Sequence, residues 1–369
     1  MNSNTTLSKL ANFSIFITAI ILLLIYAQNI LIPIVIAAFF AMLMVPMVSW
    51  LERKRINRII SISMAIILSI LIMGGVISII FSQVSSFSND FAQIQERFDV
   101  LQEQVNPYLQ KLGNYGLVLE LESIEQKAIE WAGKNLNVFT NALSSTLSSL
   151  SLLVLIPVYL FMFLLYRDHF VVVTCKIFKE YEPGHVASVV SDLRRVIQDY
   201  LSGVIKVMCI LIVLNFIAFT ALGLKHALFF AMLGGFLNII PYIGPWVGSV
   251  IPVVYALLTK DSLLYPLGIF LSIWIIQTIE NNYLTPKIVG SNVNLNPIAS
   301  FIALILGGFI WGVVGMIVFI PVFAILKKVL ELSPDTEVYG YLLGEEPKEE
   351  TKKNLEKIDN FFRRIKRKK

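Results

Sequence analysis

A glutamate followed by two asparagines, Glu280-Asn281-Asn282, interrupts the long apolar stretch that covers residues 206–328. An ionisable side chain at or near membrane depth is costly, so its presence marks a candidate functional site. The carboxylate can bind a cation, accept a proton or hydrogen-bond a polar solute. Amide side chains beside it can add further ligands. The triplet therefore suggests a transporter rather than a membrane anchor.

The residues before the triplet predict a polar helix face. Trp274, Gln277 and Asn281 lie on one face of a helix, and Glu280 stands three residues from Gln277, beside that face. We expect Gln277, Glu280, Asn281 and Asn282, together with Asn238, to bind a polar solute or a cation, and burial would let Glu280 take up a proton near neutral pH. The alternative is a hydrated helix cap at the inner membrane interface.

Composition and charge distribution place this site in a membrane protein. Hydrophobic residues make up 56% of the chain, and one crossing of a hydrocarbon core needs about 20 apolar residues. Three of the charge-free runs are too long for one crossing, so we expect each of them to fold back. The sequence predicts an all-α polytopic membrane protein. The charge-free runs are 10–51, 61–89, 135–166, 207–224, 226–259, 262–279 and 288–326.

Loop charges predict the orientation of these segments. The loop 52–60 carries four bases and one acid, and an excess of bases is typical of cytoplasmic loops. The N- and C-termini are then cytoplasmic as well. The expected parts are 10–82, an N-terminal membrane hairpin with Pro33 near its turn plus a third helix; 83–135, extracytoplasmic amphipathic helices; 136–166, a membrane helix; 167–206, a cytoplasmic loop with an interfacial helix; 207–330, a transport core with two hairpins; and 331–369, a charged cytoplasmic tail.

Two segments outside the apolar runs have an amphipathic pattern. In 83–135, apolar residues alternate in steps of four and three on both sides of Asn106-Pro107, which predicts two helices. These helices either pack on each other or contact a neighbouring subunit. In the inner loop, a stripe from Val186 to Tyr200 predicts an interfacial helix. The two helices of 83–135 would form a small extramembrane helical layer.

Prolines and glycines break the transport core. Asn238 is followed by two prolines and a glycine within five residues, Pro241, Gly244 and Pro245, which cannot continue a regular helix. Freed backbone groups are tolerated at membrane depth only where protein or a water-filled cavity satisfies them. We therefore expect a re-entrant hairpin that lines a pathway; the alternative is a loop that reaches the outer surface. The expected hairpin residues are Pro241, Tyr242, Gly244, Pro245, Gly307, Gly308 and Pro321.

The two halves of the core share a short repeat. Leu233-Gly234-Gly235-Phe236 recurs as Leu306-Gly307-Gly308-Phe309. Many transporters contain internal repeats whose broken helices meet near the midplane of the bilayer. The match is four residues long in glycine- and leucine-rich sequence, so chance similarity is the alternative to shared ancestry.

Other chemistries find no support in the residue pattern. The chain has no Walker A motif and no convincing nucleophile–base pair, so we expect neither an enzyme nor an ATP-driven pump. Cys175 and Cys209 imply no disulfide, and the scattered histidines imply no metal site. No catalytic residue, metal or cofactor is expected. The aromatic and basic tail 361–369 suits an anionic inner leaflet, or a solvated tail, better than a nucleic acid.

Several sequence strings of this chain, including those around Pro241–Pro245 and Glu280, resemble the AI-2E (autoinducer-2 exporter) family of bacterial membrane proteins. The resemblance covers residues 12–330, and it rests on Ile240-Pro241-Tyr242-Ile243-Gly244-Pro245, on Gln277, Glu280-Asn281 and Pro286-Lys287-Ile288-Val289-Gly290, on Gly307-Gly308, Gly312, Gly315 and Pro321, on Phe163 to Asp168, on Tyr200-Leu201-Ser202-Gly203, and on Pro33 with Pro46. Val204 and Asn296 depart from the family pattern, in which glutamine and histidine are common. The coupling or the substrate of this chain can therefore differ.

The resemblance implies about eight membrane segments and a homo-oligomer in the bacterial inner membrane. It implies a secondary transporter that exports a small polar solute such as autoinducer-2. A Na+(Li+)/H+ antiporter that uses the same carboxylate is the alternative, since some members exchange sodium for protons. A non-transporting membrane scaffold, which recruits partners through the basic tail, is an alternative of another class.

Overall fold

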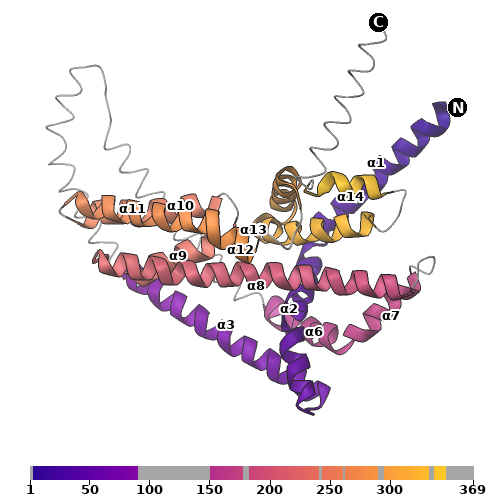
Figure 1. The fold of residues 1–369 in the computed structure, drawn as a ribbon, viewed down its shortest axis with the longest axis horizontal. Helices are drawn as coiled ribbons and strands as arrows, with labels where there is room; N and C mark the ends of the chain where they lie inside the picture. The colour runs from indigo at the N-terminus through magenta and orange to yellow at the C-terminus, as the bar shows by residue number, and fades with distance from the viewer. Residues whose placement is uncertain are drawn as a thin grey trace, which may run out of the picture. The chain divides into compact units, whose positions relative to one another are not determined.

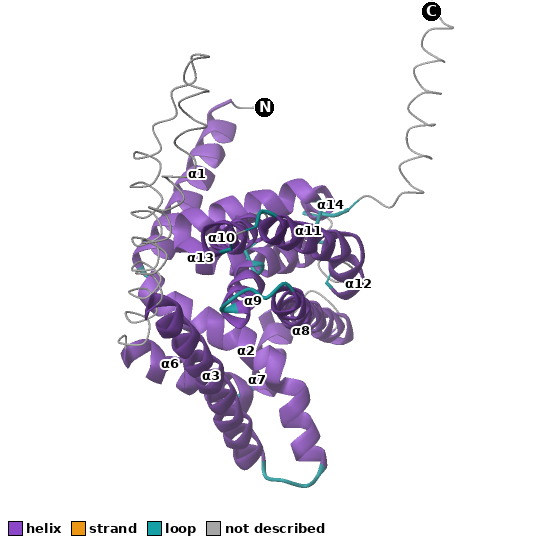
Figure 2. Cartoon of the chain, turned by 90° about the vertical axis from the view of Figure 1, so that its left-hand side faces the viewer, coloured by secondary structure: helices purple, strands orange, loops and turns teal. Residues whose placement is uncertain are grey.

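The structure, a computed structural model, describes residues 3–89, 150–177, 183–240, 243–260, 262–289, 295–331 and 336–345. Within these residues it contains helices and no strand (Figures 1 and 2). The helices are α1 (Ser3–Tyr26), α2 (Gln28–Arg53), α3 (Arg58–Asn89), α6 (Leu150–Leu165), α7 (Arg167–Ile177), α8 (Pro183–Ala221), α9 (Ala227–Leu237), α10 (Ile243–Thr259), α11 (Leu264–Ile279), the π-helix η1 (Glu280–Leu284), α12 (Thr285–Ile288), α13 (Pro297–Leu330) and α14 (Glu337–Leu343).

The long helices have the length and composition of membrane spans. Among the described residues, α2, α3, α8 and α13 are each long and apolar enough to cross a bilayer, and α6 with α7, which meet at a bend of 67°, would make a fifth span. Large apolar side chains face outward along them, such as Leu71 at 66% and Ile217 at 60% exposure. A water-soluble protein rarely exposes so much contiguous apolar surface. The chain is an all-α polytopic membrane protein.

The contacts divide the chain into two compact units. The first contains Met1–Ile32, His169–Leu201 and Val289–Lys369, and the second contains Pro33–Asp168 and Ser202–Ile288. Two apolar cores of the second unit lie within the described residues. One joins α2, α3 and α6 around Val48, Ile62 and Leu164. The other joins α8, α9, α10 and α11 around Phe219, Phe230 and Ile269, and this second core positions the candidate site.

The segments α9 and α10 form a hairpin in the second unit. Gly234 and Gly248 are far apart in the chain, yet a Cβ on Gly248 would lie 2.9 Å from the Cα of Gly234. At the turn, a Cβ on Gly244 would meet the carbonyl oxygen of Leu237. Only glycine allows backbones to approach this closely. The run 226–259 therefore folds back on itself.

In the first unit, α13 also doubles back. Trp311 and Gly312 leave the helical conformation, and Gly312 has φ +59° and ψ −140°. A Cβ on Gly307 would lie 2.3 Å from the carbonyl oxygen of Gly315, whereas eight residues of continuous helix span about 12 Å. Although α13 counts as one span by length, its two halves are the arms of a hairpin.

The N-terminal run differs from expectation in one detail. The interruption between α1 and α2 falls at Ala27, where Ala27 N donates to Leu23 O in the last turn of α1 and Leu31 N donates to Ala27 O in the first turn of α2. Pro33, expected near a turn, lies buried inside α2. The expected turn at Pro33 is therefore absent, because the backbone stays helical on both sides of it.

The amphipathic segments have different outcomes. Along the stripe from Val186 to Tyr200, Val186, Ile197 and Tyr200 are buried, but the helix continues without a break as the first half of α8, which is 39 residues long. Residues 90–135 of the expected outer helices lie outside the described residues, and so does the basic tail 361–369.

Candidate functional site

The helix that carries Glu280 changes its period at this residue. After α11 ends at Ile279, residues Glu280–Leu284 form a π-helical turn, and Thr285 N donates to the carbonyl oxygen of Glu280. A π-turn inserts one extra residue, so positions five apart stack as positions four apart do in an α-helix. Such turns are rare and occur frequently at functional sites. Here the turn brings the side chain of Thr285 to that of Glu280.

The carboxylate of Glu280 is buried, and each of its two oxygens accepts a hydrogen bond. The residue is only 5% exposed. Its Oε2 accepts a 2.7 Å hydrogen bond from Nε2 of Gln277, and its Oε1 accepts one from the hydroxyl of Thr285. Buried carboxylates without such donors are strongly destabilising. The structure therefore shows a built polar cluster rather than a hydrated helix cap.

The structure brings only part of the expected polar face together around Glu280. Gln277 and Glu280 face inward, whereas Asn281 and Asn282 are exposed, and Trp274 is 61% exposed. Nδ2 of Asn282 donates to the carbonyl oxygen of Thr278, one turn back on its own helix. Trp274 precedes the π-turn, and the buried residues Ile273, Ile276 and Glu280 keep the α-helical spacing, so Trp274 and Asn281 lie beside the buried face rather than on it.

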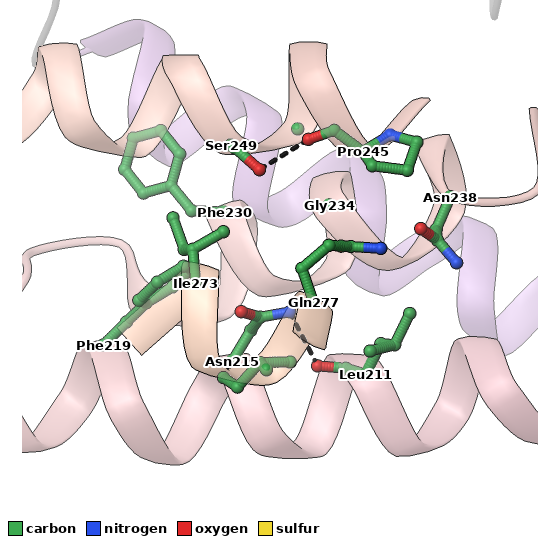
Figure 3. Close-up of a pocket in the computed structure, with 12 residues that line it drawn as sticks. Leu211, Asn215, Phe219, Phe230, Gly234, Asn238, Pro245, Ser249, Ile273 and Gln277 are labelled. Carbon is green, nitrogen blue, oxygen red and sulfur yellow. Dashed lines mark hydrogen bonds between the residues drawn. The ribbon is translucent and has the colours of Figure 1, made fainter. Parts of the chain in front are cut away.

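A cavity lies between α8, α9, α10 and α11, within the second unit (Figure 3). Its apolar walls come mostly from α8, α9 and α11, and Gly234 and Gly248 let the two arms of the α9–α10 hairpin close it on one side. About 20 Å³ is open to the centre of a water molecule, which is room for one or two waters or a small cation. The lining residues are Leu211, Asn215, Phe219, Phe230, Gly234, Asn238, Pro245, Gly248, Ser249, Ile273, Ile276 and Gln277.

Four neutral polar side chains reach this cavity, one from each surrounding segment: Asn215, Asn238, Ser249 and Gln277 (Figure 3). Nδ2 of Asn215 donates to the carbonyl oxygen of Leu211 at 2.9 Å. Its Oδ1 is buried and accepts no hydrogen bond within the described part of the chain. Buried polar atoms are nearly always paired, with protein or with bound water. This acceptor is therefore available to a donor inside the cavity.

Gln277 connects the cavity to the buried carboxylate. It lines the cavity, and because its Nε2 donates to Glu280, its carbonyl oxygen is the end left to accept. The hydroxyl of Ser249 donates to the carbonyl oxygen of Pro245, so its lone pairs are also left to accept. The polar lining is thus rich in acceptors and uncharged, and it suits a ligand that donates hydrogen bonds or carries a positive charge.

The hairpin residues expected from the sequence separate into three groups. Pro245 lines the cavity together with Asn238, and Gly244 is buried at the turn beside Leu237. Pro241 and Tyr242 lie outside the described residues. The residues Gly307, Gly308 and Pro321 belong to the α13 hairpin in the other unit and do not line this cavity.

Sequence reasoning missed Asn215 and Ser249. Both interrupt charge-free apolar runs, so each carried the signal that singled out Glu280, a polar side chain at membrane depth. The described residues contain no group of three His, Cys, Asp or Glu side chains that could hold a metal ion.

Comparisons with known proteins agree with this architecture. Residues 13–335 match the model of the family described as "AI-2E family transporter". The chain is 25% identical over 313 residues to the Bacillus subtilis protein described as "Putative transport protein YrrI", covering 82% of this chain and 86% of that one. It is 24% identical over 339 residues to "AI-2 transport protein TqsA" of Escherichia coli (strain K12), covering 88% and 92%. A Haemophilus influenzae protein described as a transport protein is 24% identical over 351 residues, with 94% and 97% covered. The chain belongs to the AI-2E transporter family, as its motifs indicate.

Proposed function

We propose that this chain is a secondary transporter that exports a small polar solute, with autoinducer-2 as the first solute to test. The family consists of transport proteins, and one relative is named for autoinducer-2 transport at 24% identity. At that identity the substrate itself does not carry over. The solute-binding residues we assign are Asn215, Asn238, Ser249 and Gln277, and Glu280 holds Gln277 in place.

The buried acceptor Oδ1 of Asn215 carries this proposal. An unpaired buried acceptor costs about 1–3 kcal/mol, and a ligand that donates a hydrogen bond removes that cost. None of the described residues that line the cavity is charged, so it favours a neutral, hydroxyl-bearing solute over an anion. Since only about 20 Å³ is open, a solute of several atoms requires the α9–α10 hairpin or α11 to shift before it binds.

The proposal extends to the placement of the protein in the cell. We assign it to the bacterial inner membrane as a multi-pass homo-oligomer with cytoplasmic N- and C-termini. The basic turn between α2 and α3, with Arg53, Lys54 and Arg55 exposed, supports this orientation through the positive-inside rule.

Efflux from liposomes that contain only this protein tests the proposal. Liposomes loaded with labelled autoinducer-2 are expected to lose it faster with wild-type protein than without protein. Gln277→Leu removes both the cavity acceptor and the donor to Glu280, and we expect it to slow efflux at least tenfold. Thr278→Val is the matched control, because the Thr278 hydroxyl bonds only its own helix, at the carbonyl of Trp274. Equal efflux with and without protein contradicts the assignment of this solute.

A cation/proton antiporter is the second candidate, and the size of the cavity favours it. One cation with a water fits the open space without rearrangement, and Gln277 connects that space to the Glu280 carboxylate. The candidate predicts that sodium collapses an imposed pH gradient in the same liposomes, read by a pH-sensitive dye, and that Glu280→Gln abolishes the response. No sodium response from folded protein removes this candidate and leaves the export of an organic solute.

A further inference from the structure

The turn between α2 and α3 carries three bases without acidic partners. Arg53, Lys54 and Arg55 follow one another and all are exposed. Among the described residues, no carboxylate lies within ion-pair distance of any of them. Their charges are therefore available to a ligand outside the protein.

The acids near this turn are neutralised by other arginines. Nη1 of Arg58 lies 2.6 Å from Oδ2 of Asp168, and its Nη2 donates to the carbonyl oxygen of Leu164 at 3.1 Å. Arg167 pairs with Glu52. These contacts fix the turn against the end of α6. They leave its three exposed bases as unbalanced positive charge on a rigid support.

The backbone at Arg55 is in a conformation that favours glycine. Arg55 has φ +65°, and the bonds Arg55 N to Glu52 O and Ile56 N to Leu51 O close the end of α2 as a Schellman motif. Glycine is the usual residue at this position because a side chain is strained there. A non-glycine residue held in strain is a reason to look for a function of its side chain.

Apolar surface borders the bases. Trp50 is 54% exposed, with Nζ of Lys54 4.0 Å from the centre of its ring. Ile59 and Ile60, at the start of α3, are 54% and 53% exposed. Tryptophan is enriched where a membrane protein crosses from lipid to water. The bases thus stand at the shared end of two helices, α2 and α3, that are each long and apolar enough to cross a membrane.

We propose that this turn is a binding site for the headgroup of an anionic phospholipid. The guanidinium groups of Arg53 and Arg55 and the ammonium group of Lys54 donate hydrogen bonds to the lipid phosphate. The acyl chains lie along Trp50 and the first turn of α3. The apolar border favours a lipid over a free phosphate in solution, because only the lipid covers both kinds of surface.

Thermal unfolding of the detergent-solubilised protein tests this site. Dioleoyl-phosphatidylglycerol is expected to raise the unfolding temperature by several degrees more than dioleoyl-phosphatidylcholine does. Arg53→Gln/Lys54→Gln/Arg55→Gln is expected to lose most of that difference, and its affinity for phosphatidylglycerol is expected to fall about a hundredfold. The control Arg194→Gln/Arg195→Gln/Lys206→Gln neutralises three exposed bases of α8 and should keep the difference.

A single substitution separates lipid binding from folding. Arg55→Gly suits the left-handed backbone, so it should raise the unfolding temperature without lipid and reduce the added effect of phosphatidylglycerol. An unchanged lipid effect in the triple variant overturns the proposal. So does an equal shift from glycerol 3-phosphate, which would mean that the turn binds any phosphate.

Discussion

At the scale of single residues, Asn215 has the least satisfied polar group near the proposed site. Its amide nitrogen bonds the carbonyl of Leu211, one turn back on its own helix, and its buried oxygen has no donor among the described residues. Asparagine is a poor helix former, and an apolar side chain would leave no unpaired polar atom at this position. A ligand donor in the cavity gives a physical reason for the asparagine.

Replacing Asn215 by leucine should move activity and stability in opposite directions. Removing a buried unpaired acceptor should leave the free energy of unfolding unchanged or raise it by about 1 kcal/mol. Loss of one hydrogen bond to the solute should lower transport efficiency about tenfold. Liposome efflux and thermal unfolding of the same preparation measure both effects. A variant that is destabilised and fully active would assign Asn215 a structural role.

Glu331, just beyond α13, makes the stability of the first unit depend on pH. Burial raises the pKa of its carboxyl, but hydrogen bonds and charges from Lys327 and Lys328 outweigh burial and hold that pKa below its ordinary value. The contribution to stability is then present above the unfolded pKa, about 4.3, and is lost as pH falls through the lower folded value. Below that value, Lys327, which is only 8% exposed, loses its charged partner.

Glu331→Gln should therefore reduce the loss of folding stability that the protein shows as pH falls. At pH 7 the free energy of unfolding of the variant should be lower than that of wild type by up to about 1 kcal/mol, as for partly exposed ion pairs. Near pH 3 this difference should be much smaller, because the wild-type pair is also losing its charge there. Unfolding temperatures measured from pH 3 to pH 7 provide the comparison. A wild-type advantage that stays constant down to pH 3 would contradict the assigned direction.

At the scale of elements, both hairpins depend on glycine contacts between their arms. The first glycine of each Leu-Gly-Gly-Phe string makes the contact: Gly234 with Gly248 and Gly307 with Gly315. A shared contact at matching positions supports the internal repeat beyond the four-residue match. Without a Cβ, the arms pack close enough for backbone atoms to touch.

Gly315→Ala should separate the arms of the α13 hairpin. Its new Cβ would overlap the backbone carbonyl of Gly307, and overpacking of this kind costs about 1–3 kcal/mol. Gly74→Ala is the control, because nothing lies within 4 Å of that position on α3, and alanine should stabilise the helix by about 0.5–1 kcal/mol. Equal unfolding temperatures for the two variants would mean that the arms do not touch in the folded protein.

The π-turn should depend on the hydroxyl of Thr285. Thr285→Val keeps the shape of the side chain and removes a hydrogen bond to Glu280, which is worth about 1.5–3 kcal/mol if the carboxylate is charged. We expect a lower unfolding temperature and several-fold slower transport, since Gln277 loses its fixed orientation. Unchanged transport in Thr285→Val would separate the carboxylate cluster from the cavity.

Part of this arrangement follows from the sequence. The lengths of the charge-free runs predicted that 226–259 and 288–326 fold back, because neither fits a single crossing. Which face of α11 turns inward could not be predicted from the polar residues alone, because the buried stripe of Ile269, Ile273, Ile276 and Glu280 follows the packing against neighbouring helices. The cavity brings Asn215 and Ser249 to Gln277 from separate helices, and no spacing along the chain encodes that contact.

At the scale of the whole molecule, the polar cluster and the cavity belong to one compact unit, and the α13 hairpin belongs to the other. Each unit thus contains one glycine-packed hairpin, as expected for a transporter built from repeats. The site that we assign is complete within the second unit. Its water access from either side of the membrane then decides whether it serves transport.

Reactivity of a cysteine at position 215 tests the central claim most directly. In a Cys175→Ser/Cys209→Ser background, Asn215→Cys should react in liposomes with a small water-soluble thiol reagent, and the transported solute should slow the reaction. Val213→Cys is the control, because Val213 lies on the same helix and is 54% exposed on its outer surface. There we expect reaction with lipid-soluble reagents alone. A cysteine at 215 that no water-soluble reagent reaches, or that the solute does not protect, would contradict the claim that this cavity binds the solute.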